Sequence, residues 1–211
     1  RCAILTGAGG TFCAGADLGG VAASGEQMHP LHAMVPVNAA AIALHELGKP
    51  SIAKVNGDAV GAGMNLALGC DLIVAGESAR FSEIFARRGL SLDFGGSWLL
   101  PRLVGMHKAK ELAFFADILS AREAERMGLV NRVVPDAELD AFVADWAERL
   151  STSAPLALQL SKKLLSNAFS IGLSEALDAE AAAQSVNLVS EDTKEGVRAF
   201  LEKRKPAFRG R

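Results

Sequence analysis

Two glycine turns and one aspartate have residue types and spacing that suit catalysis. The first turn is Phe12-Cys13-Ala14-Gly15-Ala16-Asp17-Leu18, and the second includes Gly61-Ala62-Gly63 ahead of a small-residue apolar segment typical of a buried helix. Glycine permits unusual backbone angles and close approach of other groups. The first N–H groups of a helix have no partner inside that helix. Two such donors aimed at one point would form an oxyanion hole.

Both turns also have a purely structural interpretation. Gly61 and Gly63 suit a tightly packed junction between a strand and a helix. Gly15 suits a bend, and Asp17 suits a helix cap. The residues by themselves leave both interpretations open.

Asp93 is the candidate for proton transfer. It lies among apolar residues just before Gly95-Gly96 and a run with helical character. Apolar surroundings raise the pKa of a carboxyl group, which suits acid–base catalysis. The alternative is a carboxylate at a helix N-terminus, where the helix dipole favours negative charge without any catalytic role.

The elements that must position these residues follow from apolar patterns and turn residues. Short runs typical of strands lie at residues 3–6, 52–55, 72–75 and 130–134. A helix is expected at 37–47 after Pro36, and a capping box from Ser120 to Glu123 opens a short helix that Gly128 closes. Further helical patterns occupy 136–150, 155–169, 174–189 and 192–205. Residues 19–36, which include His29 and His32, are expected to form a loop that could cover a pocket.

This order of elements predicts an α/β fold class. We expect an α/β core over residues 1–134 and a C-terminal helical region over residues 135–211. Because the chain begins abruptly at Arg1, directly before an apolar strand, we also expect N-terminal residues of the core to be missing from this sequence.

Composition excludes several classes of partner. The net charge of −2 gives no bulk attraction to nucleic acid or to a membrane surface, and no apolar run is long enough to span a bilayer. The three cysteines, Cys2, Cys13 and Cys70, have no metal-ligand spacing. They predict buried thiols in a reducing, cytoplasmic compartment and no bound metal.

The motifs, taken together and in order, resemble those of the enoyl-CoA hydratase/isomerase (crotonase) family. The matching stretches are Phe12-Cys13-Ala14-Gly15-Ala16-Asp17-Leu18, Val55-Asn56-Gly57 with Gly61-Ala62-Gly63, Leu66-Ala67 with Cys70-Asp71, Gly95-Gly96-Ser97 with Leu100-Pro101-Arg102, Gly128-Leu129-Val130, and Phe200-Leu201-Glu202-Lys203-Arg204. They cover nearly the whole chain. The resemblance implies a spiral of ββα units, followed by a C-terminal helical region that forms a homotrimer or a dimer of trimers.

The resemblance also implies a substrate and a binding site. It implies an acyl-CoA thioester whose oxygen accepts from the backbone N–H groups of Ala16 and Ala62, with coenzyme A as part of the substrate and no other cofactor. By motif position, Ala14 and Asp17 would contact the CoA, as would Phe200 and Lys203 of the last helix.

The sequence departs from the pattern of hydratases. The positions of the two glutamates that activate water in such enzymes fall on Asn65 and Phe85, and neither side chain exchanges a proton at neutral pH. Glu83 lies two residues from Phe85, and we assign it no role. The stretch 89–102 is similar to members that isomerise double bonds or ring-epoxide acyl-CoAs, in which an aspartate at the place of Asp93 is the acid and base. A dehalogenase branch uses an aspartate here as nucleophile.

The function expected from the sequence is therefore a shift of a double bond through an enolate, with Asp93 taking and returning the proton. Three alternatives stay open. They are a hydratase with a non-standard acid or base, an acyl-CoA-binding protein without chemistry, and an RNA-binding protein. The last requires a lysine-rich helix, which the 37–47 segment is not. The acyl group and the pathway are not predicted.

Overall fold

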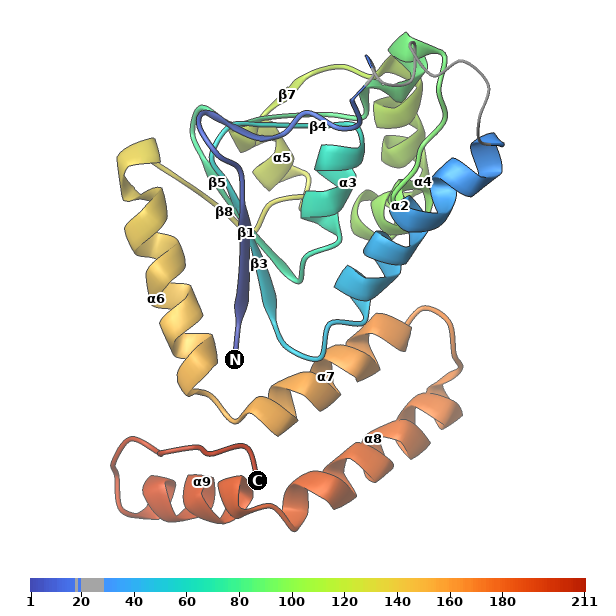
Figure 1. Cartoon of the computed structure of the whole chain (residues 1–211). Coiled ribbons are helices and arrows are strands. Elements are labelled where there is room, and N and C mark those ends of the chain that lie inside the picture. The colour runs from blue at the N-terminus through green and yellow to red at the C-terminus, as the bar shows by residue number, and fades with distance from the viewer. Residues whose placement is uncertain (18, 20–28) are drawn as a thin grey trace. The chain divides into compact units, whose positions relative to one another are not determined.

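The computed structural model describes residues 1–17, 19 and 29–211 (Figure 1). The chain forms two compact units. The larger comprises Ile4–Leu47 and Ser51–Ala144, and the smaller comprises Arg1–Ala3, Gly48–Pro50 and Asp145–Arg211. The helix α6 (Leu139–Thr152) runs from one unit into the other.

Two four-stranded sheets form the core of the larger unit. The first has the order β1 (Ala3–Thr6), β3 (Ser51–Val55), β5 (Leu72–Gly76), β8 (Arg132–Val134), and the second has β2 (Thr11–Cys13), β4 (Asp58–Val60), β6 (Arg80–Ser82), β7 (Leu119–Ser120). The pairs β3–β5, β5–β8, β2–β4 and β4–β6 are parallel, and β6–β7 is antiparallel. From β1 to β6 consecutive strands alternate between the sheets, and a helix follows each of the pairs β3–β4 and β5–β6. This confirms the predicted α/β fold with ββα units.

The first sheet is the part of the fold that the sequence predicted best. Its central strand β3 has Ile52, Ala53 and Val55 fully buried, and β5 pairs with it in register from Ile52↔Leu72 to Val55↔Ala75. Continuous apolar runs of this kind are typical of parallel strands that are covered on both faces. The second sheet was not predicted, because strands of two or three residues have no periodicity to detect.

The side chain of Asn56 fixes the connection after β1 to the end of β3. Its Nδ2 atom donates to the carbonyl oxygens of Gly7 (3.0 Å) and Gly9 (2.9 Å), and its Oδ1 atom accepts from the Gly7 amide at 3.2 Å. The chain then runs on into β2 and the first glycine turn. These bonds therefore place the first turn close to the chain that leads to the second.

The helix α2 (Pro30–His45) begins earlier than predicted. The predicted loop over residues 19–36 is wrong from Pro30 onward, and its residues 20–28 lie outside the described part of the chain. Pro30 occupies the first turn, where proline is tolerated, and the His29 side chain accepts from the Leu31 amide at 3.3 Å. Pro36, expected to start the helix, lies inside it.

Three other α-helices of the larger unit begin where the sequence patterns indicate a helix. They are α3 (Ala62–Leu68), α4 (Gly96–Phe115) and α5 (Ala121–Arg126), and two 3-10 helices, η1 (Ile84–Arg88) and η2 (Asp136–Glu138), accompany them. The capping box of α5 is present, with Ser120 accepting from the Glu123 amide. Gly105 interrupts α4 with a left-handed φ of 76°.

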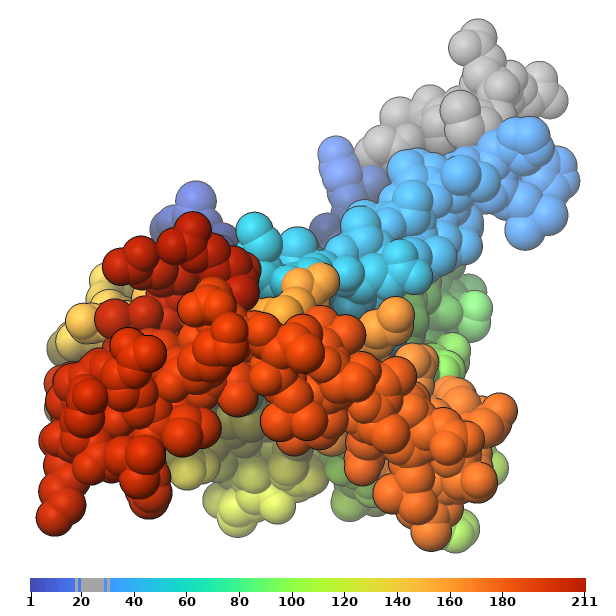
Figure 2. All heavy atoms as spheres, turned by 90° about the horizontal axis from the view of Figure 1, so that it is seen from below, coloured from blue at the N-terminus to red at the C-terminus, as the bar shows by residue number. Residues whose placement is uncertain are grey.

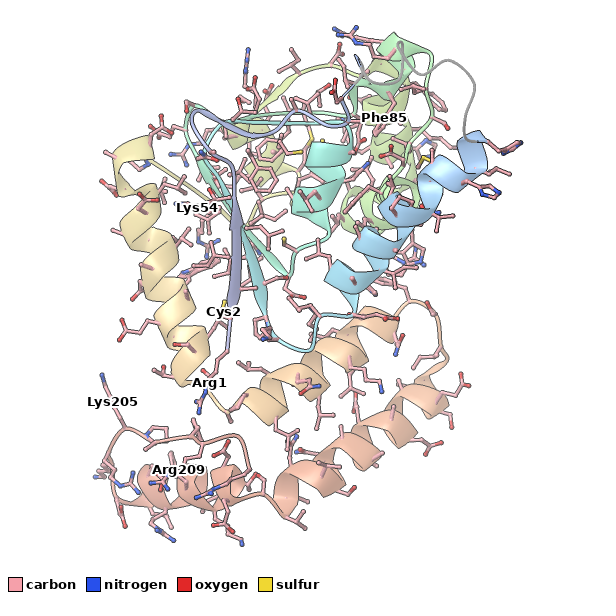
Figure 3. All side chains as sticks on the ribbon, in the orientation of Figure 1. Arg1, Cys2, Lys54, Phe85, Lys205 and Arg209 are labelled. Carbon is pink, nitrogen blue, oxygen red and sulfur yellow. The ribbon has the colours of Figure 1, made fainter. Side chains whose placement is uncertain are left out.

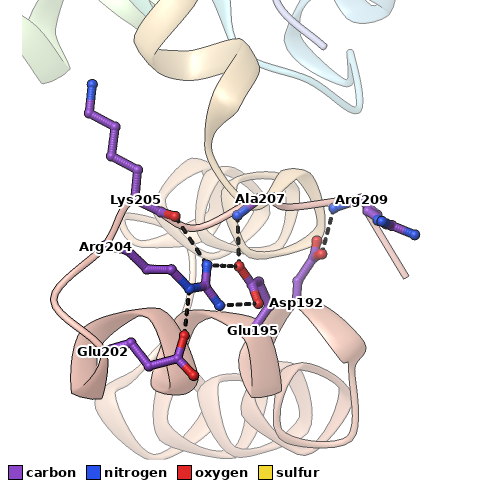
Figure 4. Close-up of polar contacts among 7 residues, drawn as sticks. All are labelled: Asp192, Glu195, Glu202, Arg204, Lys205, Ala207 and Arg209. Atoms are coloured by element: carbon purple, nitrogen blue, oxygen red, sulfur yellow. Dashed lines mark hydrogen bonds and ion pairs between the residues drawn. The ribbon is translucent and has the colours of Figure 1, made fainter.

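The smaller unit consists mainly of α7 (Pro155–Asn167), α8 (Leu173–Leu188) and α9 (Glu191–Leu201). Its C-terminal segment folds back on α9 (Figure 4). Arg204 forms an ion pair with Glu195 at 2.6 Å, and Asp192 accepts from the amides of Arg209 (2.6 Å) and Gly210 (2.7 Å). The pair with Arg204 lowers the pKa of Glu195 to about 2.

The helices α7 and α8 leave much apolar surface uncovered. A hollow of about 640 Å³ lies between them. The large exposed apolar side chains of this region are Leu165, Phe169, Leu173, Leu177, Val186, Leu188 and Val189. Figure 2 shows these helices in orange and red. No helix among the described residues has the length and apolar character needed to cross a bilayer.

Candidate active site

The structure brings the two predicted glycine turns into contact. Gly63 packs against Cys13 of β2 so closely that a Cβ at residue 63 would overlap the Cys13 carbonyl group. Gly15 has a left-handed φ of 91°, and a Cβ there would lie 3.7 Å from the Ala62 nitrogen. Ala16, the next residue, is thereby brought close to the start of α3. The backbone N–H groups of Ala16 and Ala62 donate to no other residue in the described ranges.

Replacing Gly63 with alanine tests this contact. The added methyl group would collide with backbone, which cannot move aside as a flexible side chain can, so we expect the free energy of unfolding to fall by about 3 kcal/mol. Urea denaturation measures the loss. Gly10→Ala is the matched control, because nothing lies within 4 Å of a Cβ at residue 10. A Gly63→Ala variant as stable as this control would contradict the close packing of the two turns.

Gly61 connects the start of α3 to the end of β6. It precedes the helix with φ 57° and ψ −127°, a conformation that glycine adopts without strain, and its amide donates to the Ser82 carbonyl at 2.8 Å. The residue after Ser82 is Glu83. Gly61 therefore places the Ala62 amide near the chain segment that contains Glu83.

Asn65, Glu83 and Asp93 form a buried polar cluster. The Nδ2 atom of Asn65 donates to the backbone oxygen of Asp93 at 2.9 Å and to Oε2 of Glu83 at 3.4 Å. Asn65 is completely buried, and the exposed fraction of Glu83 is 1%. Gly96 packs on Asn65, since a Cβ at residue 96 would overlap the amide group. The contact holds the segment before α4 against α3.

Both carboxyl groups of this cluster have raised pKa values. Burial raises the pKa of Glu83 to about 8, the hydrogen bond from Asn65 opposes this shift, and the nearby charge of Asp93 adds to it. Burial also raises the pKa of Asp93. A buried carboxyl group with a raised pKa is suited to proton transfer near neutral pH.

Phe85 lies in η1 beside the start of α3 and is labelled in Figure 3. A Cβ at Gly61 would lie 3.6 Å from its ring, and the ring is buried. This position is therefore apolar and has no group that could bind or activate water.

An apolar hollow of about 260 Å³ adjoins the residues that follow Asp93. Its walls come from α2, from the end of α3 and from the start of α4. The lining residues include Ile42, His45, Phe94, Gly95, Trp98 and Leu99. The rings of His45 and Trp98 make an edge contact with centroids 5.3 Å apart. The hollow is large enough for a short apolar group beside Phe94, the residue that follows Asp93.

The remaining predicted residues are not part of this cluster. Ala14 and Asp17 lie exposed on the first turn, where Asp17 accepts from the Gly19 amide at 2.9 Å. Phe200 and Lys203 are exposed residues of the smaller unit. Glu83 is the residue that sequence reasoning left without a role. Its only signal is a lone glutamate directly after a short strand, which does not reveal burial.

The structure is that of an α/β protein in which two glycine turns are in contact and two carboxyl groups share a largely buried polar cluster. Comparison with known proteins identifies the class. The sequence profile described as "Enoyl-CoA hydratase/isomerase" matches residues 1–211. The chain belongs to the enoyl-CoA hydratase/isomerase family and is an acyl-CoA enzyme of that family.

Individual relatives include both activities. A probable enoyl-CoA hydratase of Rhodobacter capsulatus is 42% identical, over 100% of this chain and 82% of its own length. A 1,2-epoxyphenylacetyl-CoA isomerase of Escherichia coli is 40% identical, again over 100% of this chain and 82% of its own length. The crystal structure of an enoyl-CoA hydratase from Bacillus anthracis superposes with a TM-score of 0.95 at 37% identity, covering 100% of this chain and 82% of that one.

Proposed function

We propose that the protein shifts a carbon–carbon double bond in an enoyl-CoA thioester, with Asp93 as the acid and base. The observation that supports this choice is the chemistry of the buried cluster. Asn65 and Phe85 occupy the positions of the hydratase glutamates, so neither of these two positions provides a carboxylate to activate water. Asp93 remains as a carboxyl group with a raised pKa beside them. A relative that is 40% identical is an isomerase by name.

The reaction proceeds in two proton transfers. The Asp93 carboxylate removes a proton from the carbon next to the thioester carbonyl, and the electron pair moves onto the thioester oxygen as an enolate. The amides of Ala16 and Ala62 donate to that oxygen. Asp93 then returns the proton at the far end of the conjugated system, and the double bond comes to lie beside the carbonyl. One carboxyl group suffices, because the same proton leaves and returns.

We further propose how the substrate is bound. The acyl group extends toward the apolar hollow beside Phe94 and Trp98, which favours a short apolar chain. Ala14 and Asp17 contact the CoA moiety, and Phe200 and Lys203 approach its nucleotide. Three copies of the chain assemble through the uncovered apolar surface of α7 and α8, giving a homotrimer or a dimer of trimers. The cysteines, which form no disulfide, suit a cytoplasmic protein.

A matched assay with a 3-enoyl-CoA and a 2-enoyl-CoA tests the reaction. We expect the absorbance of a conjugated thioester to appear from the 3-enoyl substrate and no hydrated product from the 2-enoyl substrate. Water addition to the 2-enoyl substrate without any double-bond shift would make the protein a hydratase. Tight binding of both thioesters without turnover would instead favour an acyl-CoA-binding protein.

A further inference from the structure

Glu83 is a buried ionisable group for which the proposed reaction has no use. It follows β6, its exposed fraction is 1%, and its contact with Asn65 is long at 3.4 Å. Its second oxygen, Oε1, accepts no hydrogen bond from a described residue. Burying an ionised carboxylate that is so poorly paired costs far more than burying a neutral carboxylic acid.

The cluster around Glu83 contains more acceptors than donors. The oxygens Asn65 Oδ1, Glu83 Oε1 and Asp93 Oδ1 are buried and accept from no described residue. The orientation of Asn65 is fixed, because the backbone oxygen of Asp93 can only accept and so requires the NH₂ group on its side. A proton on one carboxyl group would supply a donor that the cluster lacks.

No cation among the described residues neutralises this pair. The charge that acts on Glu83 is the like charge of Asp93. On α4, the guanidinium of Arg102 stacks on the Trp98 ring at 3.9 Å and donates to the Trp98 carbonyl. On η1, Arg87 pairs with Asp117 at 2.6 Å. Two neighbouring carboxyl groups without a cation do not both ionise readily.

We infer that Glu83 and Asp93 form a coupled carboxyl pair that retains one proton, and that this proton is on Glu83. In this arrangement Glu83 is a positioning residue that acts on Asp93 through Asn65. The neutral Glu83 leaves Asp93 as the single charged group of the pair. Asn65, held between Glu83 and the Asp93 backbone, fixes the aspartate. The catalytic part of this inference rests on the proposed function, and the protonation part does not.

The first test measures protonation without any substrate. The pKa of Glu83 is about 8 in the folded protein against 4.5 in the unfolded chain. Between these values the folded state binds the extra proton, so this group's stabilisation is complete below pH 4.5 and is lost as pH rises through about 8. Comparison of wild type with Glu83→Gln cancels the titrating groups that do not interact with Glu83. We expect the ratio of their unfolding constants to change about tenfold per pH unit from pH 5 to 8.

If the ratio of the two unfolding constants did not vary with pH, the inference that the pair retains a proton on Glu83 would be overturned, whatever reaction the protein catalyses. Glu111→Gln is the matched control, because Glu111 is a surface residue of α4 paired with Lys108. The ratio of the Glu111→Gln unfolding constant to that of the wild type should vary far less with pH. If this ratio changed with pH as steeply as the ratio for Glu83→Gln, the assignment of the proton to Glu83 would also be overturned.

The second test measures the effect on Asp93. Above pH 8 a charge on Glu83 would repel the Asp93 carboxylate and the negative enolate, so kcat of the wild type should fall about tenfold per pH unit. Glu83→Gln, which cannot ionise, should lose this decline, and Glu83→Leu, which cannot hold Asn65, should have a lower kcat at every pH. The positioning role would be overturned if kcat of Glu83→Gln still fell above pH 8, or if Glu83→Gln and Glu83→Leu lost the same fraction of kcat. Absence of activity in the wild type would refute the proposed function and leave the first test intact.

Discussion

Asp93→Asn is expected to lower kcat for the 3-enoyl-CoA about 10³-fold, because an amide of the same shape cannot take up the proton that the carboxylate removes. The loss should appear in kcat and not in substrate affinity. The backbone oxygen of Asp93, which accepts from Asn65, is unaffected by the change of side chain. Asp93 lies at the edge of the buried cluster, and its Oδ1 atom accepts from no described residue, so the substitution breaks no hydrogen bond to Oδ1 from the described part of the chain.

Asp117→Asn is the matched control for this variant. Asp117 is an exposed aspartate whose known contact is the ion pair with Arg87, and exposed pairs of this kind contribute little to stability. Its kcat should equal that of the wild type. Binding of a non-reactive acyl-CoA analogue, measured by calorimetry, should be similar in all three proteins. An Asp93→Asn enzyme that isomerises at the wild-type rate would remove Asp93 from the mechanism and leave Glu83 as the remaining carboxyl group of the cluster.

Ala62→Pro is expected to lower kcat by about 10²- to 10³-fold, because it deletes one of the two backbone donors to the enolate oxygen. The position is unusually favourable for such a test. Ala62 is the first residue of α3, where the N–H has no helical partner and where proline fits the helix. Its amide also donates to no described residue. The substitution should therefore remove the donor and leave the fold in place.

Ala62→Ser serves as the control, since it keeps the amide and adds a single oxygen to the side chain. Its kcat should stay within a few-fold of the wild type. Thermal unfolding of both variants shows whether α3 remains intact. If Ala62→Pro is folded and as active as Ala62→Ser, the Ala62 amide does not stabilise the enolate. If Ala62→Pro unfolds, residue 62 contributes to the close packing of the second glycine turn, which the structure attributes to Gly61 and Gly63 alone.

The sequence predicted the elements whose signals are local. The strands β3 and β5 are continuous apolar runs, and α5 begins with a capping box whose two partners are three residues apart. The glycine turns were recognised from residue types that tolerate close packing, and the structure brings the two turns into contact. The family was also evident from the order of the motifs. The catalytic use of Ala16, Ala62 and Asp93 stays a prediction.

The tertiary structure decided the features that depend on residues far apart in the chain. The short strands β2, β4, β6 and β7 exist through their pairing with one another, and two or three residues contain no pattern of their own. The α2 helix extends back to Pro30 because a cap and a proline at its first turn allow it, although Pro36 had suggested a later start. Glu83 differs from any surface glutamate only in what surrounds it. Asn65, which contacts both carboxyl residues, precedes Glu83 by 18 residues and Asp93 by 28 residues in the chain. Burial by such distant segments sets its pKa, and no local sequence pattern records that burial.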